Sequence, residues 1–483
     1  MSEVEEGREA RGRGDADASE GSANQKAGDE SGAGAFADEK VGGEDASVAG
    51  RGHRDAAGMA AVAARFLGRF LQWVGVSVAA AAWALARKPA TWAVVFVALL
   101  SMSMWRKGDA YIEEVSSTLA GIRELVTGDS EQYLAIADDF VQGDFSMSYV
   151  EPTGGADRAH RQPGYPALIA LAEKLGVQGA PDLARVNLAV LVGVLWIAFV
   201  SARLATGSLL AGLLATGVVY EAHFLFDLAV ERLLSEPLYV ALALPAVAAC
   251  YAYVARLSAA SLMLAAAFTG LAYLVRVNGL FLAAAVVVAI VVADLRRARR
   301  SEPEARAADL VVHLPLAAYG AALGLFVVVT AASWMPRTFY AGNPVYHGYL
   351  TNFLWVDEYD RAQVPGPPQF GLSVYVAEHG VGEALSRFSY GVSRVLYETP
   401  RDKLGIVTSM GLLMAIAVVV ALRDRPGLVI LSAGLLQAMP LVWTALSNPA
   451  QRVAAASLLP FAAMVVAAAA AAAMARAERD GSS

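Results

Sequence analysis

The chain has few of the residues that build disulfides, metal sites and nucleotide sites. Its one cysteine, Cys250, lies in an apolar run, so no disulfide can form within the chain and no cysteine-based metal site is expected. A Walker phosphate loop, a dinucleotide fingerprint and an HExxH zinc motif are all missing. The arginines border apolar runs and form no basic patch, so the sequence predicts no binding to nucleic acid.

Residues 1–57 lack aromatic side chains apart from Phe36 and are rich in Glu, Asp, Gly, Ala and Ser. Such a segment cannot bury enough apolar surface to offset the entropy that ordering would cost. We therefore expect a disordered acidic tail, which supplies much of the net charge of -7. No apolar core follows a basic start, so the segment does not resemble a signal peptide.

Long apolar runs dominate the rest of the chain. Hydrophobic residues make up 57% of the sequence, against roughly 45–50% in soluble domains. The runs end at Arg, Pro, Gly or Asp, and a helix needs about 20 apolar residues to cross a bilayer. We predict an all-α polytopic membrane protein with about ten transmembrane helices. The predicted spans are 90–105, 182–202, 206–221, 236–255, 259–275, 279–294, 309–333, 404–422, 427–446 and 453–474.

Basic residues in short loops predict the orientation, because such loops stay on the cytoplasmic side. The clearest cluster is Arg296, Arg297, Arg299 and Arg300. Alternation from this loop places every other short basic loop inside as well. Those loops contain Arg87, Lys88, Arg203, Arg256, Arg423, Arg425 and Arg476.

With this orientation, residues 89–476 form the membrane domain and the polar segments 106–181 and 334–403 lie outside. Residues 58–88 form either an interfacial helix or an extra span, and the charge pattern favours the interfacial helix. Residues 477–483 form a short tail. Both termini are expected in the cytoplasm.

The first outer segment concentrates the charged residues between positions 128 and 172. Asp129 begins a predicted helix, and Tyr133 lies four residues later on the same side. Glu131 points elsewhere and is expected to be a solvated charge. A helix dipole favours acids in its first turn, so Asp129 is either a cap or a reactive carboxylate.

A loop with His160 and Arg161 follows, and Pro163 and Pro166 then begin a second helix around Tyr165. His160 and Arg161 contact either lipid headgroups or a ligand. Arg276 and Arg452 stand at the outer ends of apolar runs. They either extend to headgroups or face the protein interior.

In its order of motifs the chain resembles the GT-C class of membrane glycosyltransferases. That class includes the protein O-mannosyltransferases and the aminoarabinose and RgtA-like transferases of bacteria. The resemblance covers roughly 90–475, and Ser130 departs from the Asp-Glu pair that is frequent in the class. The segments that carry it are Asp129 with Tyr133, Arg161–Pro166, Ser235–Leu238, Arg276–Gly279, Gly342–Pro344 with Tyr346, and Gln451–Arg452.

The resemblance implies transfer of a sugar, with inversion, from a polyprenyl-phosphate donor to a protein, lipid or glycan acceptor on the outer face of a bacterial plasma membrane. Asp129 would act as the base, and Arg161, Arg276 and Arg452 would bind the donor phosphate. The supporting residues would be His160, Glu131, Glu236, Tyr133 and Tyr165. A divalent cation is compatible with the chemistry, but no residue spacing demands a metal.

Two other functions stay open. A transporter or flippase of lipid-linked sugars would have charges in mid-span and paired halves with broken helices. A non-enzymatic membrane scaffold would present the acidic tail and would have no cavity joining Asp129 to Arg276. The transferase interpretation instead expects Asp129, Arg161, Arg276 and Arg452 to converge on one outward-facing cavity.

Overall fold

The computed structural model describes residues 88–126, 128–145, 162–276, 278–298, 372–395, 417–418, 420, 425–443 and 448–481. These residues are helical, with no strand among them, so the predicted all-α class is confirmed for this part of the chain. The predictions for 1–57, for 58–87 and for the spans 309–333 and most of 404–422 fall outside the described residues.

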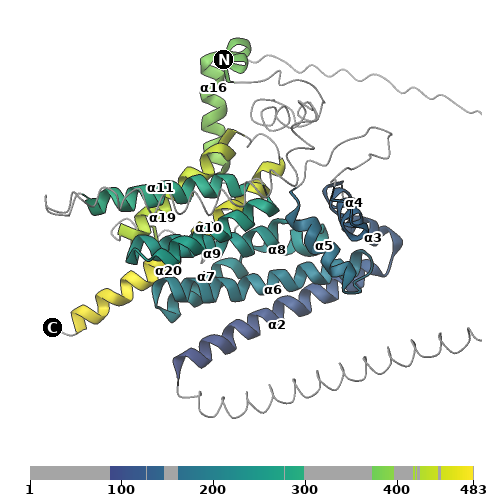
Figure 1. Ribbon diagram of the computed structural model, residues 1–483, viewed down its shortest axis with the longest axis horizontal. Helices are drawn as coiled ribbons and strands as arrows, with labels where there is room; N and C mark the ends of the chain where they lie inside the picture. The colour runs from purple at the N-terminus through teal and green to yellow at the C-terminus, as the bar shows by residue number, and fades with distance from the viewer. Residues whose placement is uncertain are drawn as a thin grey trace, which may run out of the picture. The chain divides into compact units, whose positions relative to one another are not determined.

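The long helices run side by side (Figure 1), and neighbours along the chain pack against one another. The contacts also join distant parts of the sequence, since α20 packs on α7, α9 and α19. The bounds are α2 Pro89–Ser116, α6 Gly179–Thr206, α7 Leu209–Tyr220, α9 Glu236–Arg256, α10 Ala259–Val275, α11 Asn278–Ala298, α19 Arg425–Trp443 and α20 Asn448–Gly481.

Local sequence explains where several of these helices begin and end. Pro89 starts α2, where its missing N–H costs no hydrogen bond. The side chains of Ser208 and Ser258 accept backbone N–H groups at the starts of α7 and α10. Gly207 ends α6 with a left-handed φ of 77°, and its N–H donates to the carbonyl of Arg203.

Among the described residues, four helical segments are long and apolar enough to cross a membrane, and a fifth qualifies if one bent pair counts as a span. The four are α2, α6, α9 and residues Ala454–Asp480 of α20. The shorter apolar helices Ala259–Val275, Asn278–Ala293 and Pro426–Ala438 coincide with further predicted spans. These helices are compatible with a multi-pass membrane protein. The number of about ten membrane spans stays a prediction.

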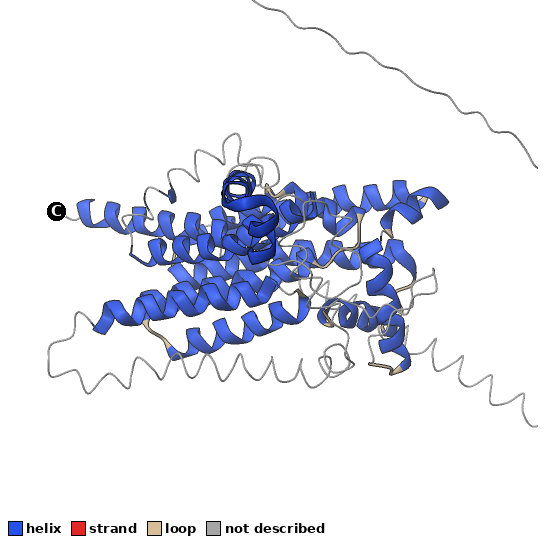
Figure 2. Cartoon of the chain, turned by 90° about the horizontal axis from the view of Figure 1, so that it is seen from above, coloured by secondary structure: helices blue, strands red, loops and turns tan. Residues whose placement is uncertain are grey.

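The predicted span 206–221 contains α7 and ends where the chain bends, but the helical arm that follows was not predicted. Helix α7 ends at Tyr220, and the chain turns by 63° into residues 223–231. This second arm consists of α8 (His223–Phe226) and a π-helical turn, η1 (Asp227–Glu231). π-helical turns are uncommon overall but occur often at functional sites. Figure 2, coloured by secondary structure, shows helices and no strand among the described residues.

Small residues allow close helix packing. A Cβ at Gly108 of α2 would lie 2.6 Å from Leu188 of α6, and one at Gly434 of α19 would lie 2.9 Å from Phe461 of α20. Close approach through small residues is a common way for membrane helices to associate.

The segment 106–181, which was predicted to lie outside, contains three short helices, α3 (Leu119–Leu125), α4 (Gly128–Gln142) and α5 (Gly164–Lys174). Helix α4 packs on α5, and α5 contacts α10. A Cβ at Gly164 would lie 2.8 Å from the carbonyl oxygen of Leu274, so glycine allows α5 to approach the end of α10. A later helix, α16 (Leu372–Ser393), packs against α19.

Candidate functional site

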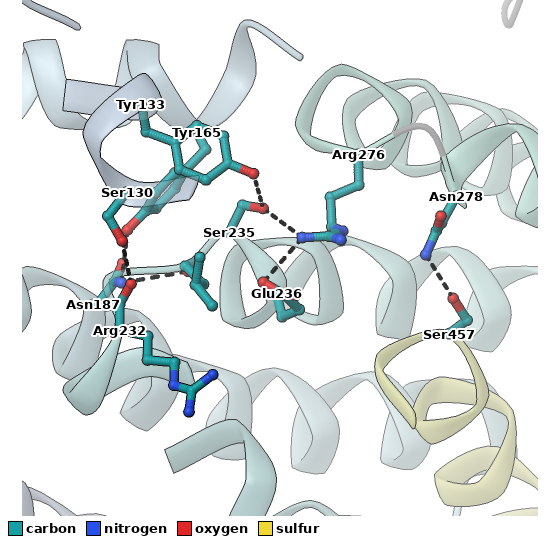
Figure 3. A network of polar contacts seen from close by, with 11 residues as sticks. Ser130, Tyr133, Tyr165, Asn187, Arg232, Ser235, Glu236, Arg276, Asn278 and Ser457 are labelled. Atoms are coloured by element: carbon teal, nitrogen blue, oxygen red, sulfur yellow. Dashed lines mark hydrogen bonds and ion pairs between the residues drawn. The ribbon is translucent and has the colours of Figure 1, made fainter. Parts of the chain in front are cut away.

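A buried polar network joins the start of α9, the end of α10 and helix α4 (Figure 3). Ser235 lies at its centre and is fully buried. Its Oγ accepts a hydrogen bond from Nη1 of Arg276 at 2.9 Å. The same oxygen lies 3.0 Å from the hydroxyl of Tyr133, which is 102 positions away in sequence. One serine therefore ties α4 to α10.

Arg276 also pairs with Glu236, the first residue of α9, at 3.0 Å between Nη1 and Oε2. The Glu236 side chain is fully buried and that of Arg276 is 13% exposed. Both contacts of Arg276 with the described residues use Nη1, whereas a guanidinium carries five N–H donors. The two side-chain contacts of Arg276 with the described residues therefore occupy one of its nitrogens, and the side chain as a whole is partly exposed.

A second set of contacts fixes the backbone just before Ser235. Ser130 of α4 donates from its Oγ to the carbonyl oxygen of Arg232. Asn187 of α6 donates from Nδ2 to the Leu234 carbonyl at 3.4 Å and to the Tyr165 hydroxyl at 2.7 Å. Between these two carbonyls, Leu233 has a φ of 45°, which is unusual for a branched side chain. Side chains from α4 and α6 thus hold a strained turn in place.

Tyr133 and Tyr165 complete the network on its outer side. Their rings meet edge to face with centroids 4.9 Å apart, an arrangement that stabilises aromatic pairs. Burial raises the pKa of Tyr165 well above its ordinary value, despite the hydrogen bond from Asn187, which lowers it. The Tyr165 hydroxyl therefore stays protonated at neutral pH and serves for binding or orientation rather than as a base.

A small cavity adjoins this network. Its volume is about 10 Å³, roughly the space that one water molecule needs. Apolar side chains of α4, α5 and α6 form most of its wall. The polar groups on the wall come from Ser130, Tyr165 and Asn187. A water here would meet several hydroxyl and amide groups, whereas a sugar needs a larger space.

Carboxylates gather on the other side of α4. Burial raises the pKa of Asp139, with Asp144 and Asp138 adding to the effect. Burial also raises the pKa of Glu173 on α5, again with a contribution from Asp138. Within the described part of the chain, no group of three or more His, Cys, Asp or Glu residues is arranged to hold a metal ion.

The structure places Asp129 in the first turn of α4, half-buried and one helical turn before Tyr133. Residues four apart lie on the same face of a helix, so Asp129 lies on the Tyr133 side of α4, next to the network. Glu131 is exposed and points elsewhere. The supporting role of Glu131 and the catalytic role of Asp129 both stay predictions.

The expected phosphate-binding arginines are only partly described. Arg276 lies in the network, whereas His160, Arg161 and the side chain of Arg452 fall outside the described residues. Arg452 is five residues before Ser457 on α20, which is about 7.5 Å along a helix axis. Ser457 accepts a hydrogen bond from Nδ2 of Asn278, two residues after Arg276. The start of α20 therefore approaches the same end of the helices.

Three members of the network were absent from the predicted site: Ser130, Asn187 and the central hydroxyl of Ser235. Asn187 carried a signal in the sequence, because an amide inside an apolar run usually makes a hydrogen bond to another helix. Ser130 explains a departure from the GT-C pattern. Its partner is a carbonyl oxygen, which needs a donor, and an ionised glutamate can only accept.

The described part of the chain thus consists of helices, four or five of which are candidate membrane spans, together with a buried polar network near helix ends. Comparison of the chain with protein-family models, with curated proteins and with solved structures finds no match. The GT-C resemblance therefore stays a prediction, and the chemistry of the site is inferred from its own residues.

Proposed function

We propose that the chain is a membrane glycosyltransferase of about ten spans, GT-C-like in fold, that uses a polyprenyl-phosphate sugar as donor. The acceptor hydroxyl belongs to a protein, lipid or glycan on the outer face of a bacterial plasma membrane. One observation carries the proposal. Through the Ser235 hydroxyl, the helix that carries Asp129 in its first turn is joined to Arg276. A carboxylate and a guanidinium are the two groups that this transfer needs.

The reaction is a single displacement with inversion. Asp129 takes the proton of the acceptor hydroxyl while that oxygen attacks the anomeric carbon of the donor sugar. The bond between this carbon and the phosphate oxygen breaks, and the polyprenyl phosphate leaves with the electron pair. Arg276 stabilises the growing charge on the phosphate through its remaining N–H donors. Arg161 and Arg452 are proposed as further phosphate ligands.

The other predicted residues take supporting parts. Glu236 and Ser235 orient Arg276, and Tyr133 and Tyr165 set the position of α4 and α5 relative to it. His160 and Glu131 are proposed to contact the acceptor or the donor headgroup. The proposal assigns no metal ion, although the chemistry is compatible with a divalent cation.

The test is transfer in cells that carry a deletion of the gene, measured by mass spectrometry of surface glycans and glycoproteins. Wild-type protein should restore the missing product. Asp129→Asn should restore none at an equal level of membrane protein. Asp138→Asn, which changes an exposed carboxylate on the same helix, should restore it. Full restoration by Asp129→Asn would exclude Asp129 as the base.

One observation favours a second function, the transport of a lipid-linked sugar. The break between α7 and the arm at residues 223–231 resembles the interrupted helices of transporters. Proteoliposomes separate the two functions. A transporter moves a labelled polyprenyl-phosphate sugar across the bilayer without an acceptor, whereas a transferase forms a product only when the acceptor is present.

A further inference from the structure

The pair of Arg276 and Glu236 is exposed on one side only. The Glu236 side chain is fully buried, and the 13% exposure of the Arg276 side chain is the only opening of this pair to the outside. Ser235 accepts the other hydrogen bond from the same Nη1 atom and is itself fully buried. Because the Glu236 side chain is fully buried, a ligand of this pair must bind from the Arg276 side.

We infer that Glu236 is an internal counter-ion that weakens the binding of a phosphate ligand to Arg276. The inference rests on the proposed phosphate site and adds to it a residue that sets its affinity. In the empty site the carboxylate balances the guanidinium, and an incoming phosphate competes with it for the same positive charge.

The charge balance leads to this role. A guanidinium buried without a partner is strongly unfavourable, so Glu236 stabilises the empty site. A phosphate bound at the exposed side of Arg276 lies close to the Glu236 carboxylate, and the two negative charges repel each other across a medium of low dielectric. Binding is therefore weaker than Arg276 alone would give.

Weak binding suits a site whose product must leave. After transfer, the polyprenyl phosphate carries more negative charge than the donor did, because the sugar no longer esterifies its phosphate. Repulsion from Glu236 is then greatest, so it acts most strongly on the product. Release of product limits the rate of many enzymes, and a buried carboxylate behind the phosphate site speeds that step.

The inference predicts opposite effects for the two partners of one ion pair. Glu236→Gln keeps an acceptor for Arg276 but removes the negative charge, so a phosphate becomes the counter-ion and should bind about tenfold more tightly. Arg276→Gln should weaken binding by at least about tenfold. A pair that is only structural would instead make both variants bind more weakly.

The experiment uses the full chain in phosphatidylcholine nanodiscs, with farnesyl phosphate as the probe. The dissociation constant is measured by titration for the wild type, Glu236→Gln and Arg276→Gln. Farnesol reports binding of the tail alone, and inorganic phosphate reports binding without the tail. Asp109→Asn is the matched control, because Asp109 pairs with Arg185 at 2.9 Å outside the network; its affinity should equal that of the wild type.

Each outcome is decisive. If Arg276→Gln binds farnesyl phosphate like the wild type, the proposed phosphate site is wrong. If Arg276→Gln loses binding but Glu236→Gln binds equally or more weakly, the phosphate site stands and the counter-ion role is excluded. If the Glu236→Gln protein is obtained in soluble, folded form only when farnesyl phosphate is present during purification, the counter-ion role of Glu236 is supported. If the variant aggregates both with and without farnesyl phosphate, that role is contradicted.

Discussion

Two ion pairs of this protein have almost equal lengths and different surroundings. Arg276 and Glu236 lie 3.0 Å apart with 13% and 0% of their side chains exposed. Arg185 and Asp109 lie 2.9 Å apart, each with 35% exposed. Water solvates Arg185 and Asp109 whether or not they pair, whereas the buried Glu236 carboxylate depends on Arg276 to balance its charge. Burial rather than distance therefore shows which arginine belongs to a site.

The largest loss of stability should come from breaking the buried pair of Arg276 and Glu236. Arg276→Ala leaves the Glu236 carboxylate buried without its guanidinium, which should lower the free energy of unfolding by about 3–5 kcal/mol. Arg185→Ala should cost about 1 kcal/mol or less, because both of its carboxylate partners are solvated. Melting temperatures of the two variants in one detergent measure the difference. Equal losses would remove the distinction between the pairs.

A smaller loss is expected at Asn187. Asn187→Leu removes the donor to the Leu234 carbonyl and to the Tyr165 hydroxyl, which should cost about 1–3 kcal/mol. The control is Thr269→Val, because Thr269 is also fully buried but donates to Ala265 of its own helix. If the control variant melts as low as Asn187→Leu, the amide does not hold the strained turn.

Coupling between Tyr133 and Ser235 should be smaller still. Tyr133→Phe and Ser235→Ala each remove one side of a 3.0 Å contact, so each should cost about 1 kcal/mol from this bond. The double variant should cost less than the sum, because the second change finds the bond already gone. Additive losses in melting temperature would show that the hydroxyls do not interact.

The smallest expected effect is the pH dependence of the contribution that Asp139 makes to stability. Its pKa is raised by burial above the ordinary 3.8, so its contribution to stability is present below pH 3.8 and is lost as the pH rises through the raised value. Asp139→Asn cannot ionise and should melt higher than the wild type at pH 7, with the gain disappearing in acid. Glu113→Gln, at an exposed position, should show no such change. A gain for Asp139→Asn that is constant with pH would contradict the assignment.

The sequence predicted helices best where apolar runs end at strong signals. Helices α6, α9 and α10 match the predicted ranges within a few residues, because caps and prolines mark their ends. The helical arm at residues 223–231 was not predicted. Apolar composition continues through Phe224 and Leu228, and a π-helical turn has no distinct pattern of residues.

In the site, the charged residues could be predicted from the sequence, but the hydrogen-bond partners of the hydroxyl groups could not. Arg276, Glu236, Tyr133 and Tyr165 were named from sequence and lie together in the network. Ser235 was named in sequence only as part of the segment Ser235–Leu238, one of those that carry the resemblance. Its role as the junction depends on the fold, because its two partners come from helices 102 and 41 positions away. Packing of distant helices cannot be inferred from the local pattern around one serine.

The central claim is that a polyprenyl phosphate binds at this network. A polyprenyl phosphate with a photoreactive group next to its phosphate tests it directly, when it is crosslinked to the full chain in nanodiscs and located by mass spectrometry. The claim predicts labelled peptides that contain residues 129–133, 232–236 or 276, with labelling reduced by an excess of unlabelled polyprenyl phosphate. Labelling confined to peptides around Arg185 and Asp109, or labelling that the competitor leaves unchanged, would contradict it.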